Sequence, residues 1–181
     1  VAGFDAVMTV ELHSENVVPF FRIPVMELSA HEFLGASLKR LNLLGTVVVS
    51  PDAGGKSRSA RFAKTVGLPI VYLEKDRDKV TGKVTVTGVK GDVGGKDVVI
   101  FDDIINTGAT AIKTSAFLKS RGAKRIFFLA THAVLAGDAA QKLDQSPIDQ
   151  VVLTDTITIP KEKLFPKLRV VSVAQLLADA L

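Results

Sequence analysis

Short apolar runs alternate with helix-forming stretches along most of this 181-residue sequence, and this alternation restricts the possible folds most strongly. Strands are predicted at residues 5–10, 46–49, 69–73, 97–101, 125–131, 150–154 and 168–173. Helices are predicted at residues 29–44, 57–66 and 109–120. Because strands that alternate with helices form parallel sheets covered on both faces, we expect an α/β fold with a mostly parallel, doubly wound sheet.

Local signals refine this expectation at three places. Ser29 and Glu32 form a capping-box pattern at the start of the first helix. Gly122 is placed to end the third helix. Residues 83–89 alternate between polar and apolar side chains, which predicts a small exposed antiparallel strand beside the parallel ones.

Composition excludes several classes of protein. With 47% hydrophobic and 23% charged residues the chain is not disordered, and its length favours one domain over residues 1–181. It contains no cysteine, which excludes a disulfide framework and fits a reducing cytoplasm. No apolar run approaches the ~20 residues of a membrane span, and no signal peptide is evident. The charge of +4 is dispersed, so we expect neither a nucleic acid nor a membrane as partner.

The most informative segment covers residues 98–110, where an apolar strand leads into two acids, a Thr-Gly-x-Thr loop and a helix. Amides and hydroxyls at a helix start bind anions, whereas adjacent carboxylates would repel a phosphate. Both features fit a sugar phosphate, whose hydroxyls would contact the acids and whose phosphate would contact the loop. The alternative is an acid pair that only caps a turn. The candidate binding residues are Asp102, Asp103, Asn106, Thr107, Gly108, Ala109 and Thr110.

This string resembles the phosphoribosyl pyrophosphate (PRPP) motif of phosphoribosyltransferases and of ribose-phosphate pyrophosphokinases. Four further segments resemble those of the pyrophosphokinases and occur in the same order, at residues 11–25, 49–55, 73–77 and 131–137. The sequence is therefore identified as similar to the C-terminal half of that family, within the type I phosphoribosyltransferase superfamily. The resemblance implies a Rossmann-like sheet of the phosphoribosyltransferase type, with a small antiparallel flag.

The resemblance also implies an activity and roles for individual residues. The family transfers the β,γ-diphosphoryl group of Mg-ATP to the C1 hydroxyl of ribose 5-phosphate, which yields PRPP and AMP. Lys75 and Arg77 match the catalytic loop and would clamp the transferring phosphoryl oxygens; the alternative is a solvated charge run. His13 would contact the ATP phosphates or their Mg²⁺, although a lone histidine is more often structural. Asp52 would lie near the ribose and a second Mg²⁺.

Family members have a second, N-terminal domain that binds ATP, and its nucleotide-site segments are not found here. We therefore expect the chain to bind ribose 5-phosphate or PRPP without turning over ATP by itself, and to assemble as a homo-oligomer with that missing domain. Glu11 stands where the family often has Asp.

Two other functions remain open at this point. One is a purine or pyrimidine phosphoribosyltransferase that uses the same loop, and the other is a non-catalytic regulatory paralogue. His31 and His132 are interpreted as structural, while Lys56 and Arg58 face either phosphates or solvent.

Overall fold

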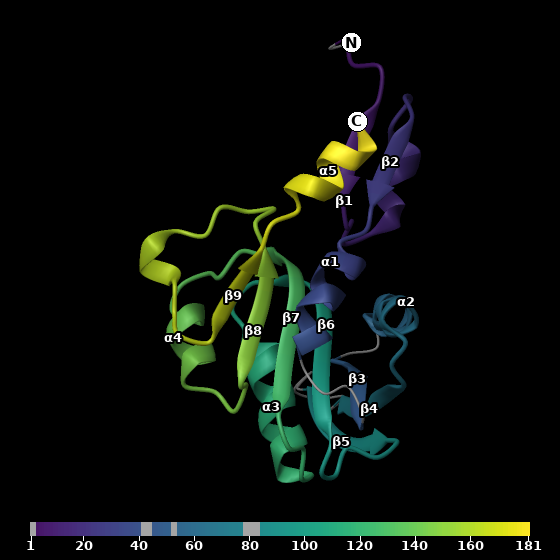
Figure 1. Cartoon of the computed structure of the whole chain (residues 1–181). Coiled ribbons are helices and arrows are strands. Elements are labelled where there is room, and N and C mark those ends of the chain that lie inside the picture. Colours follow the sequence, from purple (N-terminus) through teal and green to yellow (C-terminus); the bar gives the residue numbers. More distant parts are fainter. Residues whose placement is uncertain (1–2, 41–44, 52–53, 78–83) are drawn as a thin grey trace.

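A seven-stranded sheet forms the centre of the molecule (Figure 1). The computed structural model describes residues 3–40, 45–51, 54–77 and 84–181. The strands lie in the order β5-β4-β3-β6-β7-β8-β9, and all pairs are parallel except β4 with β5. The expected doubly wound sheet with an antiparallel flag is therefore confirmed. The strand bounds are β3 Thr46–Ser50, β4 Ile70–Arg77, β5 Val84–Lys90, β6 Asp97–Ile105, β7 Ile126–Ala133, β8 Gln150–Thr154 and β9 Leu168–Val171.

Helices cover both faces of this sheet. The α-helices are α1 His31–Ala36, α2 Lys56–Val66, α3 Ala109–Ser120, α4 Ala139–Asp144 and α5 Ala174–Ala180, and the 3-10 helices are η1 Glu15–Phe20, η2 Ser37–Arg40 and η3 Lys161–Lys163. Within the described ranges, no helix has the length and apolar character needed to cross a membrane.

The core consists of two apolar clusters, one on each side of the sheet. Because successive strand side chains point to opposite faces, Ile100 of β6 packs in a cluster with Leu118 of α3 and Leu143 of α4. Its neighbour Phe101 packs in the other cluster with Leu34 of α1 and Phe62 of α2. The rings of Phe62 and Phe101 stack with their centroids 4.1 Å apart. Helix α2 is thereby fixed against the strand that carries the acid pair.

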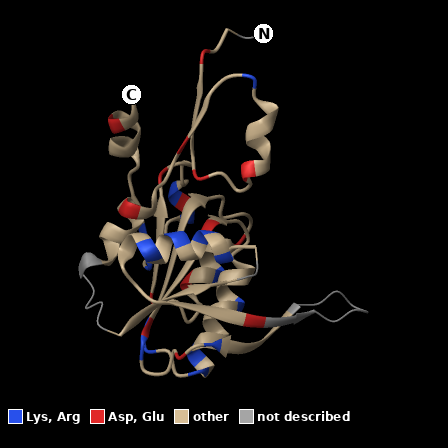
Figure 2. Ribbon diagram, turned by 90° about the vertical axis from the view of Figure 1, so that its right-hand side faces the viewer, with Lys and Arg blue, Asp and Glu red and all other residues tan. Residues whose placement is uncertain are grey.

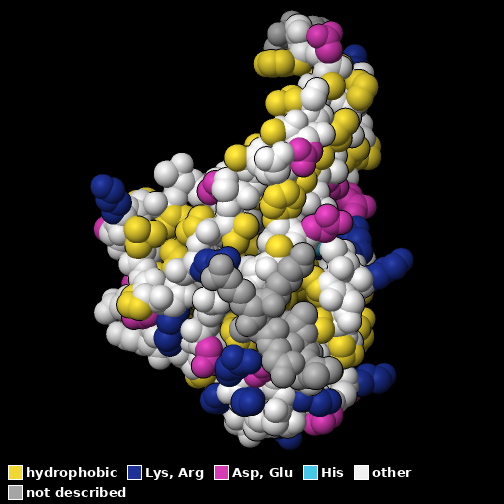
Figure 3. Space-filling view, in the orientation of Figure 1, with side chains coloured by type: hydrophobic (Ala, Val, Ile, Leu, Met, Phe, Trp, Pro, Cys, Tyr) yellow, Lys and Arg dark blue, Asp and Glu magenta, His cyan; other side chains and the backbone are white. Residues whose placement is uncertain are grey.

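A small second sheet projects from this body (Figures 1 and 2). Its strands, β1 Val7–Val10 and β2 Val25–Leu28, pair in parallel and are joined through η1. The start of α5 lies near the end of β1, because Val10, Ala174 and Leu177 line one pocket. Apolar side chains gather along this projection in Figure 3, and those of Phe20 and Met26 are among the exposed ones. The strand expected at residues 5–10 is thus present, but outside the main sheet.

The helix expected at residues 29–44 is shorter than predicted, and its capping box is wrong. The N-cap is Ala30, whose side chain makes no cap, while Ser29 accepts the amide hydrogen of His31 at 3.3 Å. The Ser37 hydroxyl donates to the carbonyl of Leu34, a bond that competes with regular helical pairing, and the chain continues as η2. Residues 41–44 lie outside the described part.

Two strands extend beyond the ends that apolar patterning predicts. β4 continues through the charge run to Arg77, which lies opposite Val84 of β5. β6 continues past the acids to Ile105, which lies opposite Ala133 of β7. Asp102 and Asp103 therefore belong to a strand rather than to the loop that follows it, because the partner strand continues to offer backbone hydrogen bonds there.

Replacement of the buried ring of Phe62 tests the coupling between α2 and the sheet. Phe62 is 0% exposed, so Phe62→Ala should lower the free energy of unfolding by about 3–5 kcal/mol in urea denaturation. Phe20→Ala is the matched control, because that ring is 86% exposed and its loss should change the same quantity by less than about 0.5 kcal/mol. Equal losses for the two variants would contradict the assigned core.

Candidate functional site

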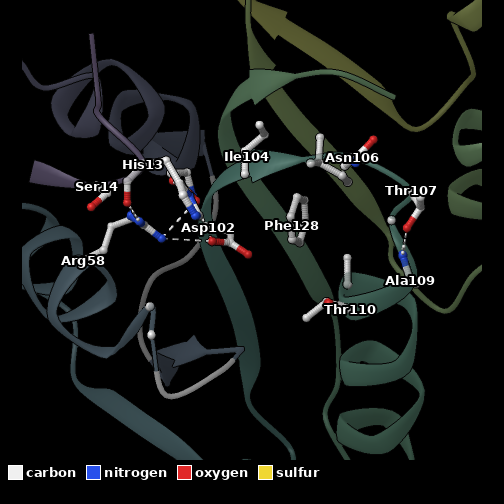
Figure 4. A pocket seen from close by; sticks show the side chains of 16 residues that line it. His13, Ser14, Arg58, Asp102, Ile104, Asn106, Thr107, Ala109, Thr110 and Phe128 are labelled. Carbon is white, nitrogen blue, oxygen red and sulfur yellow. Dashed lines mark hydrogen bonds and ion pairs between the residues drawn. The ribbon is translucent and has the colours of Figure 1, made fainter. Parts of the chain in front are cut away.

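A cavity of about 490 Å³ lies at the carboxyl ends of the central strands (Figure 4). In parallel sheets these ends meet at one edge, which is where ligands bind. Gly54 and Gly55 reach the cavity from the turn after β3, and Phe128 reaches it from β7. The cavity brings together eight residues that the sequence singled out, namely His13, Asp102, Asp103, Asn106, Thr107, Gly108, Ala109 and Thr110.

Asp103 is the buried centre of the acidic end of the cavity. Its side chain is 1% exposed, and its Oδ2 lies 2.7 Å from Nδ1 of His13. Its Oδ1 lies 2.9 Å from Nη1 of Arg58, which comes from the first turn of α2. Arg58 also donates from Nη2 to the backbone carbonyl of His13 at 3.2 Å. The carboxylate therefore joins the segment after β1 to helix α2.

Asp102 is more accessible than Asp103, with 17% of its side chain exposed. Its Oδ1 accepts from Nη1 of Arg58 at 3.2 Å and from the backbone amide of Asp103 at 3.0 Å. The two acids thus share one nitrogen of Arg58, but Asp103 is buried more deeply. Asp102 is thus the acid that a ligand in the cavity meets first.

The surroundings of Asp103 keep it ionised. Burial alone would raise the pKa of its carboxyl group, but the hydrogen bonds with Asp102 and His13 and the charge of Arg58 outweigh burial. The pKa of Asp103 consequently lies below its ordinary value. A charged acid at this place holds the guanidinium and the imidazole in fixed positions.

The loop from Asn106 to Gly108 forms the other end of the cavity. Gly108 is the N-cap of α3 and has φ +72°, a left-handed conformation that favours glycine. A Cβ atom on Gly108 would lie 3.2 Å from Cγ of Leu143. Thr107 accepts the amide hydrogen of Ala109 through Oγ1 at 3.4 Å. The first amides of a helix have no partner within it and carry the positive end of its dipole, so this end suits an anion.

Figure 4 shows the two ends on either side of Phe128. His13, Arg58 and Asp102 lie together on one side of the ring, and Thr107 and Thr110 lie on the other. The ring is 2% exposed, so it forms the floor between a charged end and an amide-lined end. This arrangement fits a ligand that carries hydroxyls at one end and an anion at the other.

The expected catalytic pair lies in β4, next to the flag strand. The backbone register shifts between Glu74 and Lys75, after which Lys75 lies opposite Val86 and Arg77 opposite Val84. The catalytic role of the pair stays a prediction. Asp52 lies outside the described residues, so its expected place near the ribose and a metal also stays a prediction.

Arg58 is the site residue whose role the sequence left open. It lies next to the acids because β3 and β6 are neighbours, so the helix after β3 begins beside the end of β6. The sequence offered one indication of this role, because Arg58 follows closely after the Gly54-Gly55 turn that ends at the cavity. Lys56, the other undecided cation, lies over the ring of Tyr72 at 5.7 Å from its centroid. The structural roles expected for His31 and His132 agree with their contacts to Glu11.

Among the described residues there is no group of three or more His, Asp or Glu side chains arranged to hold a metal ion. The orientation of His13 fits contact with a ligand. Its Nδ1 contacts Asp103, and its side chain is 77% exposed, so Nε2 is the ring nitrogen that a ligand can reach. A carboxylate behind a histidine is also the usual support of metal-binding imidazoles.

Acid titration tests the state of Asp103. Because its pKa is lowered in the folded protein, its contribution to stability is complete above the ordinary value of 3.8 and is lost as the pH falls through the lower folded value. Asp103→Asn should reduce stability by about 3 kcal/mol at pH 7 and by less below pH ~4, measured by urea unfolding. Asp179→Asn in α5 is the control. A loss that stays constant across this range would contradict an ionised Asp103.

Comparisons with known proteins agree with this geometry. Residues 50–181 match the family model described as "Phosphoribosyl synthetase-associated domain". The ribose-phosphate pyrophosphokinase of Vibrio cholerae is 41% identical over 181 residues, which cover 99% of this chain and 57% of the relative. The chain thus spans little more than half the length of that relative.

Solved structures with a similar fold include one that is also similar in sequence. The phosphoribosylpyrophosphate synthetase of Mycobacterium smegmatis superposes with a TM-score of 0.89 at 34% identity, covering 99% of this chain and 58% of that one. The adenine phosphoribosyltransferase of Giardia lamblia, at 17% identity and a TM-score of 0.56 over 79% of this chain and 76% of that one, shares the fold alone. The family model matches well over half of the sequence, and the chain therefore belongs to the phosphoribosyl synthetase-associated domain family.

Proposed function

We propose that this chain carries the ribose 5-phosphate site of a ribose-phosphate diphosphokinase, which transfers the β,γ-diphosphoryl group of ATP to the C1 hydroxyl of ribose 5-phosphate and releases AMP. One observation carries the proposal: a single cavity has an acid pair and His13 at one end and the amides of the α3 loop at the other. The names of the relatives from Vibrio cholerae and Mycobacterium smegmatis support the same reaction.

The amide end would hold the 5-phosphate. Backbone amides at the start of α3 and the hydroxyls of Thr107 and Thr110 line this part of the cavity. Gly108 brings the backbone close to the ligand because it has no side chain and adopts a left-handed conformation. Such a site binds a phosphate by hydrogen bonds and by the helix dipole without a full positive charge.

The acidic end would hold the sugar hydroxyls. Asp102 accepts hydrogen bonds from hydroxyl groups, and it is the more accessible of the two acids. Asp103 lies beneath it and keeps Arg58 and His13 in place. Contact of Asp103 with the sugar requires one of these two partners to move aside. In this proposal the acid pair fixes the ribose ring, and the orientation of the C1 hydroxyl follows from it.

His13 would face the phosphates of the nucleotide. Its Nδ1 is held by Asp103, so Nε2 of the exposed ring is the nitrogen that contacts a phosphate oxygen or the Mg²⁺ bound to it. Asp52 is proposed as a carboxylate ligand of a second Mg²⁺. Magnesium usually binds one or two carboxylates together with substrate phosphates, and it supplies charge neutralisation when present.

Lys75 and Arg77 would stabilise the charge that develops on the transferring group. They lie two residues apart in β4, where the backbone of Lys75 is opposite Val86 and that of Arg77 is opposite Val84. Transfer of a diphosphoryl group depends mainly on positioning and on cationic stabilisation of the transition state. The pair is therefore assigned the catalytic role, whereas Arg58 is already bound to the two acids.

The remaining components of the reaction are proposed to come from outside this chain. The chain covers 57% of its Vibrio cholerae relative, and we assign the binding of the adenine of ATP to a further, N-terminal domain. Residues 1–181 then act as one phosphoribosyltransferase-like domain within a cytoplasmic homo-oligomer. By itself this domain should bind ribose 5-phosphate or PRPP without forming AMP.

Substitution of Gly108 tests the phosphate end of the site. An alanine at φ +72° is strained by roughly 1–2 kcal/mol, so Gly108→Ala should displace the loop. We expect calorimetry to show an affinity for ribose 5-phosphate that is about ten-fold weaker. Gly95→Ala is a matched control, because Gly95 has φ +69°, a Cβ atom added there would meet no described atom within 4 Å, and the residue does not line the cavity. Equal weakening by both variants would contradict the assigned loop.

Substitution of Lys75 tests the reaction itself. In the full-length protein that contains this chain, Lys75→Ala should reduce AMP formation from ATP and ribose 5-phosphate by at least about 10²-fold. Lys113→Ala, an exposed residue of α3, is the control and should retain the wild-type rate. A loss below about 10²-fold would exclude Lys75 from transition-state stabilisation. Pyrophosphate release from PRPP and a nucleobase, with no AMP formed, would favour a phosphoribosyltransferase instead.

A further inference from the structure

Glu11, the residue that follows β1, has an unusual backbone conformation. Its φ is +46°, and among the described non-glycine residues only Leu135 shares a positive value. Glutamate rarely adopts this conformation, and the residue is also buried, with 8% of its surface exposed. Local preference therefore does not explain the conformation, and the surroundings of Glu11 must hold it in place.

Three different elements contact Glu11. Its amide donates to the carbonyl of Leu28 at the end of β2, at 2.9 Å. Its carbonyl accepts from Nε2 of His132 in β7, at 2.8 Å. Its Oε2 lies 3.0 Å from Nε2 of His31, the first residue of α1. The backbone and the side chain of Glu11 are thus both fixed, and the point where the chain leaves the small sheet is tied to the main body.

His31 connects this contact to the strand of the acid pair. Its side chain is 7% exposed, and its ring meets the edges or faces of Phe101 at 5.0 Å and Phe62 at 5.7 Å between centroids. Phe101 immediately precedes Asp102 in β6. The carboxylate of Glu11 is therefore linked through His31 to the ring that precedes the acid pair in β6.

Only Leu12 separates Glu11 from His13. The amide of Leu12 donates to Oε1 of Glu27 at 2.8 Å, so this short segment is also held. The ring of His13 is 77% exposed and contacts the buried Oδ2 of Asp103 at 2.7 Å. The ring has little packing of its own, so its position depends on the contact with Asp103 and on the course of the backbone that leads to it.

We propose that Glu11 is a positioning residue, which directs the backbone so that the imidazole of His13 contacts Asp103 and faces the cavity. His31 is the partner that holds the side chain of Glu11 in the conformation required for this. The consequence for turnover rests on the proposed function, whereas the position of the ring does not. Glu11 and His31 are not among the residues that line the cavity and, by this proposal, do not contact the substrates.

The experiment compares Glu11→Gln with wild type in the full-length protein that contains this chain. The substitution keeps the size of the side chain and removes its charge. The measurements are the imidazole ¹H and ¹⁵N resonances of His13, the melting temperature, and kcat and KM for AMP formation. His13→Gln identifies the His13 resonances. Glu15→Gln is the matched control, because Glu15 lies in the same segment and its ion pair with Arg61 at 3.0 Å is exposed.

A positioning role predicts a shift of the His13 resonances and a fall in kcat of roughly ten- to a hundred-fold, with a smaller change in KM for ribose 5-phosphate. His31→Gln should cause the same resonance shift, and Glu11→Asp should restore it only in part, because the shorter side chain stops short of His31. The control should match wild type. A lower melting temperature with unchanged His13 resonances would mean that Glu11 only fastens the two sheets together, and would overturn the proposal.

Two further outcomes separate this inference from the proposed reaction. If Glu11→Gln does not fold, His31→Gln approaches the same contact from its other side, and unchanged His13 resonances in that variant overturn the proposal. If wild type forms no AMP under any condition, the proposed function fails. The resonances of His13 in the Glu11 and His31 variants still decide whether Glu11 positions the ring.

Discussion

The rest of the site depends on the contacts that the buried carboxylate of Asp103 makes with Arg58 and His13. The carboxylate lies between the guanidinium of Arg58 and the imidazole of His13, and its pKa is held below the ordinary value by these partners and by Asp102 despite burial. A lone buried charge is costly, whereas one that is paired on both sides organises its neighbours. The segment after β1, the first turn of α2 and the end of β6 meet at this one group.

The sheet topology supplies the remaining geometry. The adjacency of β3, β6 and β7 places three strand ends at a single edge, and the cavity opens there. Helix α3 begins at the same edge and its first residues line the cavity, so the acidic end and the end at the helix start arise from one stretch of chain. This explains how residues 102–110 provide most of the lining, while His13 and Arg58 arrive from distant parts of the sequence.

The strand, turn and helix around the acid pair could be predicted from local sequence. Strand ends and contacts that depend on an adjacent strand could not. The apolar run before Asp102 and the Gly108 loop define a strand, a turn and a helix wherever they occur, and the structure has all three. The true end of β6 depended on β7, because backbone pairing rather than apolarity extends it to Ile105. The helix starts one residue later than the capping box predicts, where His31 packs against Phe101. The role of Arg58 required knowing which strands are neighbours.

Helix α2 takes part in both the hydrophobic core and the lining of the cavity. Phe62 stacks on Phe101 in the interior, and Arg58, one helical turn earlier, contacts the acids at the surface of the cavity. A rotation or slide of this helix would move both contacts together, since a helix is rigid over such a short length. A substitution at the buried ring would therefore disturb the contacts of the acid pair as well as the core, and repacking that face to stabilise the protein would also shift Arg58 at the edge of the cavity.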